Sequence, residues 1–224
     1  MPGARTRPPL PVVVLVSGQG SNLQAILDRQ HDIRVRVQAV ISDRPDAPAL
    51  LRAHKAGAIT QTVFPADYPD RAAHDRALAD AVDRQQPGLV VLAGYMRILS
   101  ADFVRRYAGR LLNIHPSLLP KYRGLHTHRR ALEAGETVHG CSVHYVIEAL
   151  DSGAVVAQAE VPVGPGDTET ALRLRVQARE HELFPEVIRW FAAGRLKLEG
   201  QALLFDGTPL SRPKVFAWGK KVQA

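Results

Sequence analysis

The stretch that decides the fold is VVVLVSGQGSN, residues 12–22. Its first five residues are an unbroken apolar run rich in valine, which is typical of a strand buried on both faces of a sheet. A turn with two glycines follows, and Leu23, Ile26 and Leu27 then recur at helical spacing over residues 22–30. A buried strand, a tight turn and an amphipathic helix together predict the opening unit of an α/β fold.

The same alternation continues as far as residue 115. Strands are predicted over residues 35–41, 59–64, 89–93 and 110–114, and helices over residues 47–55, 70–86 and 101–107. Strands joined through helices form right-handed crossovers, which place helices on both faces of a parallel sheet. The predicted fold is therefore α/β, with a doubly wound and mainly parallel sheet.

The pattern changes after residue 115. We expect a loop over 116–124, a short helix over 127–134, strands over 141–146 and 155–163, a long helix over 168–193, and a hairpin around Asp206-Gly207 in a short β tail. No stretch reads as a linker between domains, so residues 1–224 are expected to form a single domain. Its core would span residues 12–197, and residues 1–11 and 207–224 are expected to be flexible tails.

Composition excludes several classes of protein. Of the net charge of +7, six charges fall in residues 1–10 and 207–224, so the body is almost neutral and a nucleic-acid partner is not expected. No apolar run approaches the roughly 20 residues of a membrane span, so no membrane partner is expected. The single cysteine, Cys141, allows no internal disulfide and is expected to be a buried, unreactive thiol. These features favour a cytoplasmic protein.

The glycine-rich turn at residues 18–22 is a candidate binding site. Glycine permits close approach of a ligand to the backbone, and the N-terminus of the following helix offers free N–H groups and the positive end of a dipole to a phosphate. A dinucleotide site remains open, although Leu23 stands where its third glycine would be. The third possibility is that residues 18–22 form a tight turn that binds no ligand.

Asn113 and His115 are the candidate catalytic pair. They lie at the carboxyl end of a predicted strand, where open α/β sheets bind ligands, and their side chains share one face because strands have a period of two. An amide donor can stabilise an oxyanion, and an imidazole can move a proton, so the pair suits acyl transfer to an amine. Asp151 is the carboxylate expected to raise the pKa of His115. A purely structural histidine is the alternative.

A metal site is not expected. His126, His128, His139 and His144 lie close in the sequence, but no H-E-x-x-H pattern or comparable ligand spacing is present.

Five stretches together resemble the folate-dependent phosphoribosylglycinamide formyltransferase family. They are VSGQGSNLQAI (16–26), LAGYMRILS (92–100), LLNIHPSLLP (111–120), GLHTH (124–128) and GCSVHYV (140–146), the last leading on to LDSG (150–153). The resemblance covers residues 12–197 and implies a Rossmann-like formyltransferase fold. Cys141 departs from the threonine common in the family, and Arg123 stands where the family often has another residue.

The resemblance implies roles for matching residues. Asn113, His115 and Asp151 would be catalytic; Gly20, Ser21, Asn22 and Glu180 would bind the ribonucleotide; Arg71, Met96, Arg97, Ile98, Leu99 and Asn113 would line the folate pocket. The substrates would be glycinamide ribonucleotide and 10-formyltetrahydrofolate as a cosubstrate, with no tightly bound cofactor. A homodimer is compatible with the resemblance, although the sequence does not reveal the oligomeric state.

Three alternatives remain open at this point. Methionyl-tRNA formyltransferase shares the Asn-x-His chemistry but carries a further C-terminal domain, and about 27 residues after Lys197 would not provide one. A formyltetrahydrofolate hydrolase would need an additional N-terminal domain. A phosphate-binding protein with an inactive site is the third alternative.

Overall fold

The computed structural model describes residues 8–200 and 202–222. The strands are β1 (Leu10–Val16), β2 (Val35–Ser42), β3 (Ile59–Thr62), β4 (Leu89–Leu92), β5 (Leu111–His115), β6 (Val138–Tyr145), β7 (Val155–Pro162), β8 (Leu196–Glu199), β9 (Ala202–Phe205), β10 (Thr208–Pro209) and β11 (Lys214–Phe216). The helices are α1 (Ser21–Arg29), α2 (Pro48–Lys55), α3 (Arg71–Asp83), α4 (Ala101–Arg106), α5 (Thr127–Glu133) and α6 (Glu169–Ala192), with a 3₁₀ turn at Pro65–Asp67.

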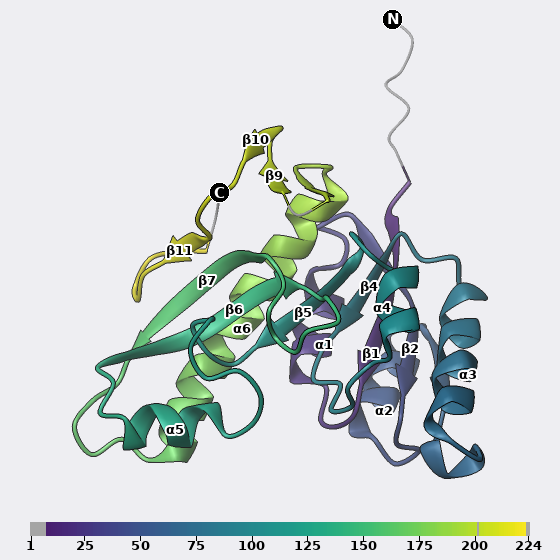
Figure 1. Ribbon diagram of the computed structural model, residues 1–224, viewed down its shortest axis with the longest axis horizontal. Coiled ribbons are helices and arrows are strands. Elements are labelled where there is room, and N and C mark those ends of the chain that lie inside the picture. Colours follow the sequence, from purple (N-terminus) through teal and green to yellow (C-terminus); the bar gives the residue numbers. More distant parts are fainter. Residues whose placement is uncertain (1–7, 201, 223–224) are drawn as a thin grey trace, which may run out of the picture.

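An eight-stranded sheet organises the molecule, in the order β11-β7-β6-β5-β4-β1-β2-β3 (Figure 1). Strands β1 to β5 pair with one another in parallel, β6 is antiparallel to both β5 and β7, and β11 runs parallel to β7. The chain moves outward from β1 through β2 to β3, and then returns to place β4 on the other side of β1. This reversal of strand order is the position where open α/β sheets bind ligands.

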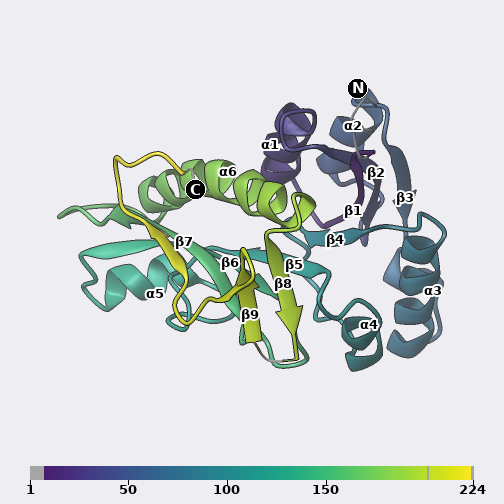
Figure 2. The same cartoon turned by 90° about the horizontal axis from the view of Figure 1, so that it is seen from above.

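Helices cover both faces of the sheet, as predicted for a doubly wound fold (Figure 2). Apolar side chains of α1, α2 and α6 pack on one face around Ile26, Ala53 and Phe184, all completely buried. Those of α3 and α4 pack on the other face around Leu78 and Phe103. The valines of β1 contribute to both cores, because alternate side chains point to opposite faces. Burial on both faces explains the continuous apolar run at residues 12–16.

Most predicted element ends lie within a few residues of the observed ones, and local chemistry explains several of them. Ser100 and Thr168 cap α4 and α6 by accepting hydrogen bonds from the amides of Phe103 and Ala171. Of the predicted lead-in over residues 1–11, residues 1–7 lie outside the described residues. β1 begins at Leu10, which pairs with Val35, so the strand reaches further toward the N-terminus than predicted.

The expectation of a flexible tail over residues 207–224 needs correction for its described part. The predicted hairpin is present as β9 and β10, but the chain then adds β11 to the main sheet beside β7. The buried guanidinium of Arg179 on α6 donates to the carbonyls of Phe216, Ala217 and Lys220. Positive charge in this segment suggested a solvated tail, whereas backbone pairing and one buried arginine fix it to the body. Among the described residues, no helix combines the length and apolarity needed to cross a membrane.

Candidate active site

Two adjoining cavities lie at the carboxyl ends of β1, β4 and β5. The larger has a volume of about 770 Å³ and the smaller of about 460 Å³. Both are lined by Gly94, Met96, Ile114, Pro116 and His128, which form the boundary between them. Ser17 ties the ends of β1 and β4 together, because its amide donates to the carbonyl of Gly94 and its Oγ accepts from the amide of Met96. Ligands in the two cavities would therefore meet at the switch point of the sheet.

The glycine-rich turn forms one wall of the smaller cavity. Gly20 precedes α1 with φ of 72°, and a Cβ there would lie 2.6 Å from Cβ of Ala49. Both the left-handed backbone and the contact with α2 require glycine at this position. No side chain caps α1, so amides of its first turn are available to an anion. This geometry fits the predicted phosphate site.

Helix α6 supplies the opposite wall of the smaller cavity. Glu180 is buried there and accepts a hydrogen bond of 2.8 Å from Nδ2 of Asn22, while Gln177 donates to Oγ of Ser21. Burial raises the pKa of Glu180, and the bond from Asn22 offsets part of that rise. Residues 20–22 and Glu180, predicted to bind one substrate, therefore surround one cavity. Gln177 belongs to it as well and was not predicted.

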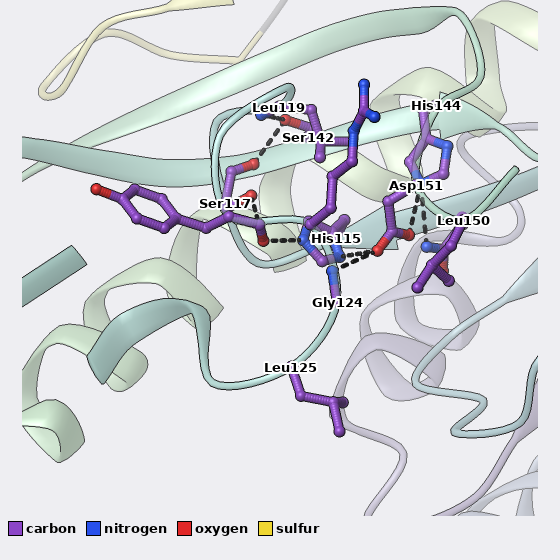
Figure 3. A network of polar contacts seen from close by, with 12 residues as sticks. His115, Ser117, Leu119, Gly124, Leu125, Ser142, His144, Leu150 and Asp151 are labelled. Carbon is purple, nitrogen blue, oxygen red and sulfur yellow. Dashed lines mark hydrogen bonds and ion pairs between the residues drawn. The ribbon is translucent and has the colours of Figure 1, made fainter. Parts of the chain in front are cut away.

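The structure brings Asn113, His115 and Asp151 together on one wall of the larger cavity. Figure 3 shows His115 facing Asp151. Asn113 and His115 come from β5, and Asp151 comes from the turn between β6 and β7. Nδ1 of His115 lies 3.4 Å from Oδ2 of Asp151. Nε2 of His115 lies 2.9 Å from the carbonyl oxygen of Tyr122. A carbonyl can only accept, so Nε2 carries a hydrogen and donates it.

The pKa of His115 lies below its ordinary value of 6.5. Burial, which disfavours the cation, is the largest cause, whereas the hydrogen bond to Tyr122 and the charge of Asp151 raise the pKa part of the way back. Asp151 therefore acts in the predicted direction, but the net shift is opposite to the predicted rise. The sequence pattern showed the carboxylate and did not show how completely the ring is buried.

Asp151 is held by three contacts (Figure 3). Its carboxylate accepts from the amide of Gly124 at 2.9 Å, and it faces Nδ1 of His115 and Nε2 of His144. Burial raises the pKa of Asp151, but these contacts outweigh it and the net shift is downward. The residue has φ of 47°, a left-handed conformation that aspartate and asparagine tolerate better than most residues. The side chain is therefore ionised and fixed in direction.

His144 is a member of this site that sequence reasoning considered only as a metal ligand. It lies opposite Asn113 in the pairing of β5 with β6. Its Nδ1 donates to the carbonyl of Tyr145, and its Nε2 lies 3.1 Å from Nδ2 of Asn113 and 3.6 Å from Oδ1 of Asp151. In the neutral form of His144, Nε2 accepts one N–H of the Asn113 amide, and the other N–H remains for a ligand. Alternation along β6 places Ser142 and His144 on one face, but only the register reveals their neighbour.

The residues predicted for the folate pocket divide into two groups. Met96, Arg97, Ile98 and Leu99 line the larger cavity, with Met96 and Ile98 exposed at 63% and 61%. Arg71 is not among the residues that line it. It donates to the carbonyl of Ile98 at 2.7 Å, so it supports the loop at the rim of the cavity.

Cys141 is completely buried, as predicted, and burial raises the pKa of its thiol well above the ordinary value. Across residues 8–200 and 202–222, no group of three or more histidine, cysteine or acidic side chains is arranged to hold a metal ion.

The arrangement combines an anion site, a buried carboxylate and an oxyanion site along one path. An amine held near Glu180 in the smaller cavity could face a carbonyl carbon in the larger one. The second N–H of Asn113, and His115 when it carries a proton on both nitrogens, could stabilise negative charge on a carbonyl oxygen in the larger cavity. These are the groups that acyl transfer to an amine requires.

Comparison with known families agrees with this chemistry. Residues 10–188 match the formyl transferase family, and the chain belongs to that family. A phosphoribosylglycinamide formyltransferase from Escherichia coli is 54% identical over 201 residues, which cover 89% of this chain and 95% of the relative.

Solved structures point the same way. A phosphoribosylglycinamide formyltransferase from Coxiella burnetii aligns with a TM-score of 0.90 at 48% identity and covers 93% of this chain and 99% of its own. A glycinamide ribonucleotide transformylase from Symbiobacterium toebii aligns with a TM-score of 0.85 at 48% identity, covering 88% and 94%.

Proposed function

We propose that this protein transfers the formyl group of 10-formyltetrahydrofolate to the amine of glycinamide ribonucleotide, a step of de novo purine synthesis. The observation that carries the proposal is the junction of two cavities, one with a phosphate turn and a buried carboxylate, the other with Asn113, His115 and Asp151. The names of the similar proteins support the same activity.

The two substrates divide between the cavities. The phosphate of the ribonucleotide binds at Gly20, Ser21 and Asn22, and its amine is oriented by Glu180. The folate occupies the larger cavity between the loop at residues 96–99 and the turn that carries Asp151. Exposed apolar side chains at the rim, including Met96 and Leu125, provide contact area for a flat ring system. Arg71 acts on the folate through the loop it supports.

The reaction needs no enzyme nucleophile. The amine nitrogen attacks the formyl carbon and forms a C–N bond, and the carbonyl oxygen becomes an oxyanion stabilised by Asn113 and His115. Collapse breaks the bond from carbon to N10 of the folate. The proton lost by the amine passes to N10, and His115 can carry it. The products are formylglycinamide ribonucleotide and tetrahydrofolate.

The charges around His115 favour protonation of its ring when the oxyanion forms. Burial lowers the pKa of His115 and so favours the neutral ring. An oxyanion forming beside the ring adds a second negative charge to that of Asp151, and both favour the imidazolium. His115 thus gains its proton when the intermediate needs stabilisation.

The proposal includes a cytoplasmic location, which the single buried Cys141 supports. The folate binds and leaves in each turnover as a cosubstrate. The residues proposed to bind the two substrates all come from this chain.

A two-substrate assay tests the function. The protein is incubated with glycinamide ribonucleotide and 10-formyltetrahydrofolate, and release of tetrahydrofolate is followed together with formylation of the ribonucleotide. The transferase requires both compounds. Release without the ribonucleotide would indicate a hydrolase, and no release would indicate a binding protein. Formylation of methionyl-tRNA in place of the ribonucleotide would also overturn the proposal.

A further inference from the structure

The carbonyl of Tyr122 has a direct effect on His115. It accepts the hydrogen of Nε2 at 2.9 Å and raises the pKa of the ring. Asp151, at Nδ1, is also an acceptor, so both neighbours of the ring favour a hydrogen on the nitrogen they face. The direction of the ring and its affinity for a proton therefore depend on where the chain places this carbonyl.

Ser117 holds the part of the loop that carries Tyr122. Its Oγ donates to the carbonyl of Lys121 at 2.6 Å and lies 3.4 Å from the carbonyl of Tyr122. Its amide donates to the carbonyl of His115 at 2.9 Å. Ser117 is completely buried, so these bonds do not compete with water. Hydrogen bonds from one serine to backbone carbonyls therefore hold together the two ends of the loop from His115 to Tyr122.

Ser142 on β6 fixes the other side of this loop (Figure 3). Its Oγ accepts from the amide of Leu119 at 3.0 Å and from Nε2 of Gln158 at 2.9 Å. With two donors facing it, the hydroxyl must direct its own hydrogen to the carbonyl of Ser117, 2.6 Å away. Every hydrogen-bonding position of this hydroxyl is filled.

Gln158 on β7 anchors the network. Its Nε2 donates one hydrogen to Oγ of Ser142 and the other to the carbonyl of Leu119 at 2.8 Å. The side chain is buried and is not among the residues that line the two cavities. Without this amide, the carbonyl of Leu119 would lose a buried partner, and the hydroxyl of Ser142 would lose the donor that fixes its direction.

We propose that Gln158 is a positioning residue for His115. It acts through Ser142, the loop at residues 116–122 and the carbonyl of Tyr122, without touching a substrate. The inference rests on the proposed role of His115 in formyl transfer. Gln158 acts on a loop of the protein itself, so its effect on the pKa of His115 can be measured without a substrate.

The test compares Gln158→Met with Val161→Ala. Methionine keeps the length of the side chain and removes both donors, whereas Val161→Ala removes buried volume from the same strand outside the network. The pKa of His115 is measured in each substrate-free protein by NMR of ¹⁵N-histidine, and kcat and KM are measured for both substrates. Thermal unfolding shows how far each variant is destabilised.

For Gln158→Met we expect the pKa of His115 to fall by about half a unit or more, because a carbonyl that stabilised the cation is no longer fixed. We expect kcat to fall about tenfold or more, with the KM for glycinamide ribonucleotide unchanged. Val161→Ala should change the unfolding temperature alone. An unchanged titration of His115, with a loss of kcat no larger than in Val161→Ala, would overturn the proposal.

A second pair of variants keeps the proposal testable if Gln158→Met does not fold. Ser117→Ala should lower the pKa of His115 in the same direction, and Ser117→Thr, which retains Oγ, should restore it. Equal titration in both would overturn the proposed path. If wild type fails the two-substrate assay, the proposed function fails, while the titrations still report whether the network controls the ring.

Discussion

The two cavities meet at Gly94, Met96 and Pro116 but are built in different ways. The smaller one depends mainly on backbone: a glycine turn and the first turn of α1, with side chains of α6 opposite. The larger one depends on titratable side chains from β5, β6 and the turn after β6. A backbone site has fixed charge and geometry, whereas the charge of a side-chain site varies with pH and with what is bound. The phosphate turn and the catalytic side chains of β5 and the turn after β6 therefore lie in different cavities along one path.

The largest expected effect concerns the larger cavity, which carries the catalytic side chains. His115→Ala should reduce kcat by a factor of about 10² or more, since it removes the group that carries the proton. Binding of glycinamide ribonucleotide, measured by calorimetry, should be nearly unchanged because its contacts lie in the smaller cavity. A near-normal kcat would show that His115 is structural.

The next effect concerns the smaller cavity and its glycine-rich turn. Gly20→Ala combines a left-handed φ with a Cβ placed 2.6 Å from Cβ of Ala49. We expect it to destabilise the protein by about 2–4 kcal/mol and to raise the KM for glycinamide ribonucleotide about tenfold. Gly57→Ala is the matched control, because Gly57 has φ of 75° but its Cβ would meet nothing within 4 Å. Equal losses in both variants would show that the contact with α2 does not matter.

A smaller effect concerns the charge of the larger cavity. Asp151→Asn keeps a residue that tolerates φ of 47° but removes the charge that raises the pKa of His115. With a lower pKa, the imidazolium is lost at lower pH, so the alkaline limb of the kcat profile should move down by about one pH unit. An unchanged profile would contradict the coupling of these two residues.

The smallest effect is on stability. Burial lowers the pKa of His139 to about 4, so between pH 6.5 and 4 the unfolded chain binds a proton at this position that the folded protein does not. The free energy of unfolding should therefore decline as pH falls through this window. Denaturant unfolding at several pH values should show a shallower decline in His139→Gln, by up to the equivalent of one proton. A slope identical to that of wild type would be inconsistent with a buried neutral ring.

The sequence predicted what short-range patterns determine. The run at residues 12–16 indicated a strand buried on two faces, and period-two alternation correctly placed Asn113 and His115 in one cavity. The contact of His144 with Asn113 could not be predicted, because it depends on the register of β5 with β6, in which Asn113 lies opposite His144. The role of the Tyr122 carbonyl could not be predicted from the amino-acid sequence either, because every residue has a backbone carbonyl. Burial of His115 also follows only from the assembled fold, and it reversed the expected net shift of the pKa.

The last strand has a consequence for how the protein is made. β11 covers the edge of β7 at Ala157–Ala159, and it is synthesised more than fifty residues after that edge. Until it docks, the N–H and C=O groups on that side of β7 have no strand beside them and can pair with another chain. A substitution of Arg179, whose guanidinium holds the end of β11 and the segment after it, would prolong that exposure. Its damage would then be seen as aggregation during expression, in a protein whose catalytic groups are all intact.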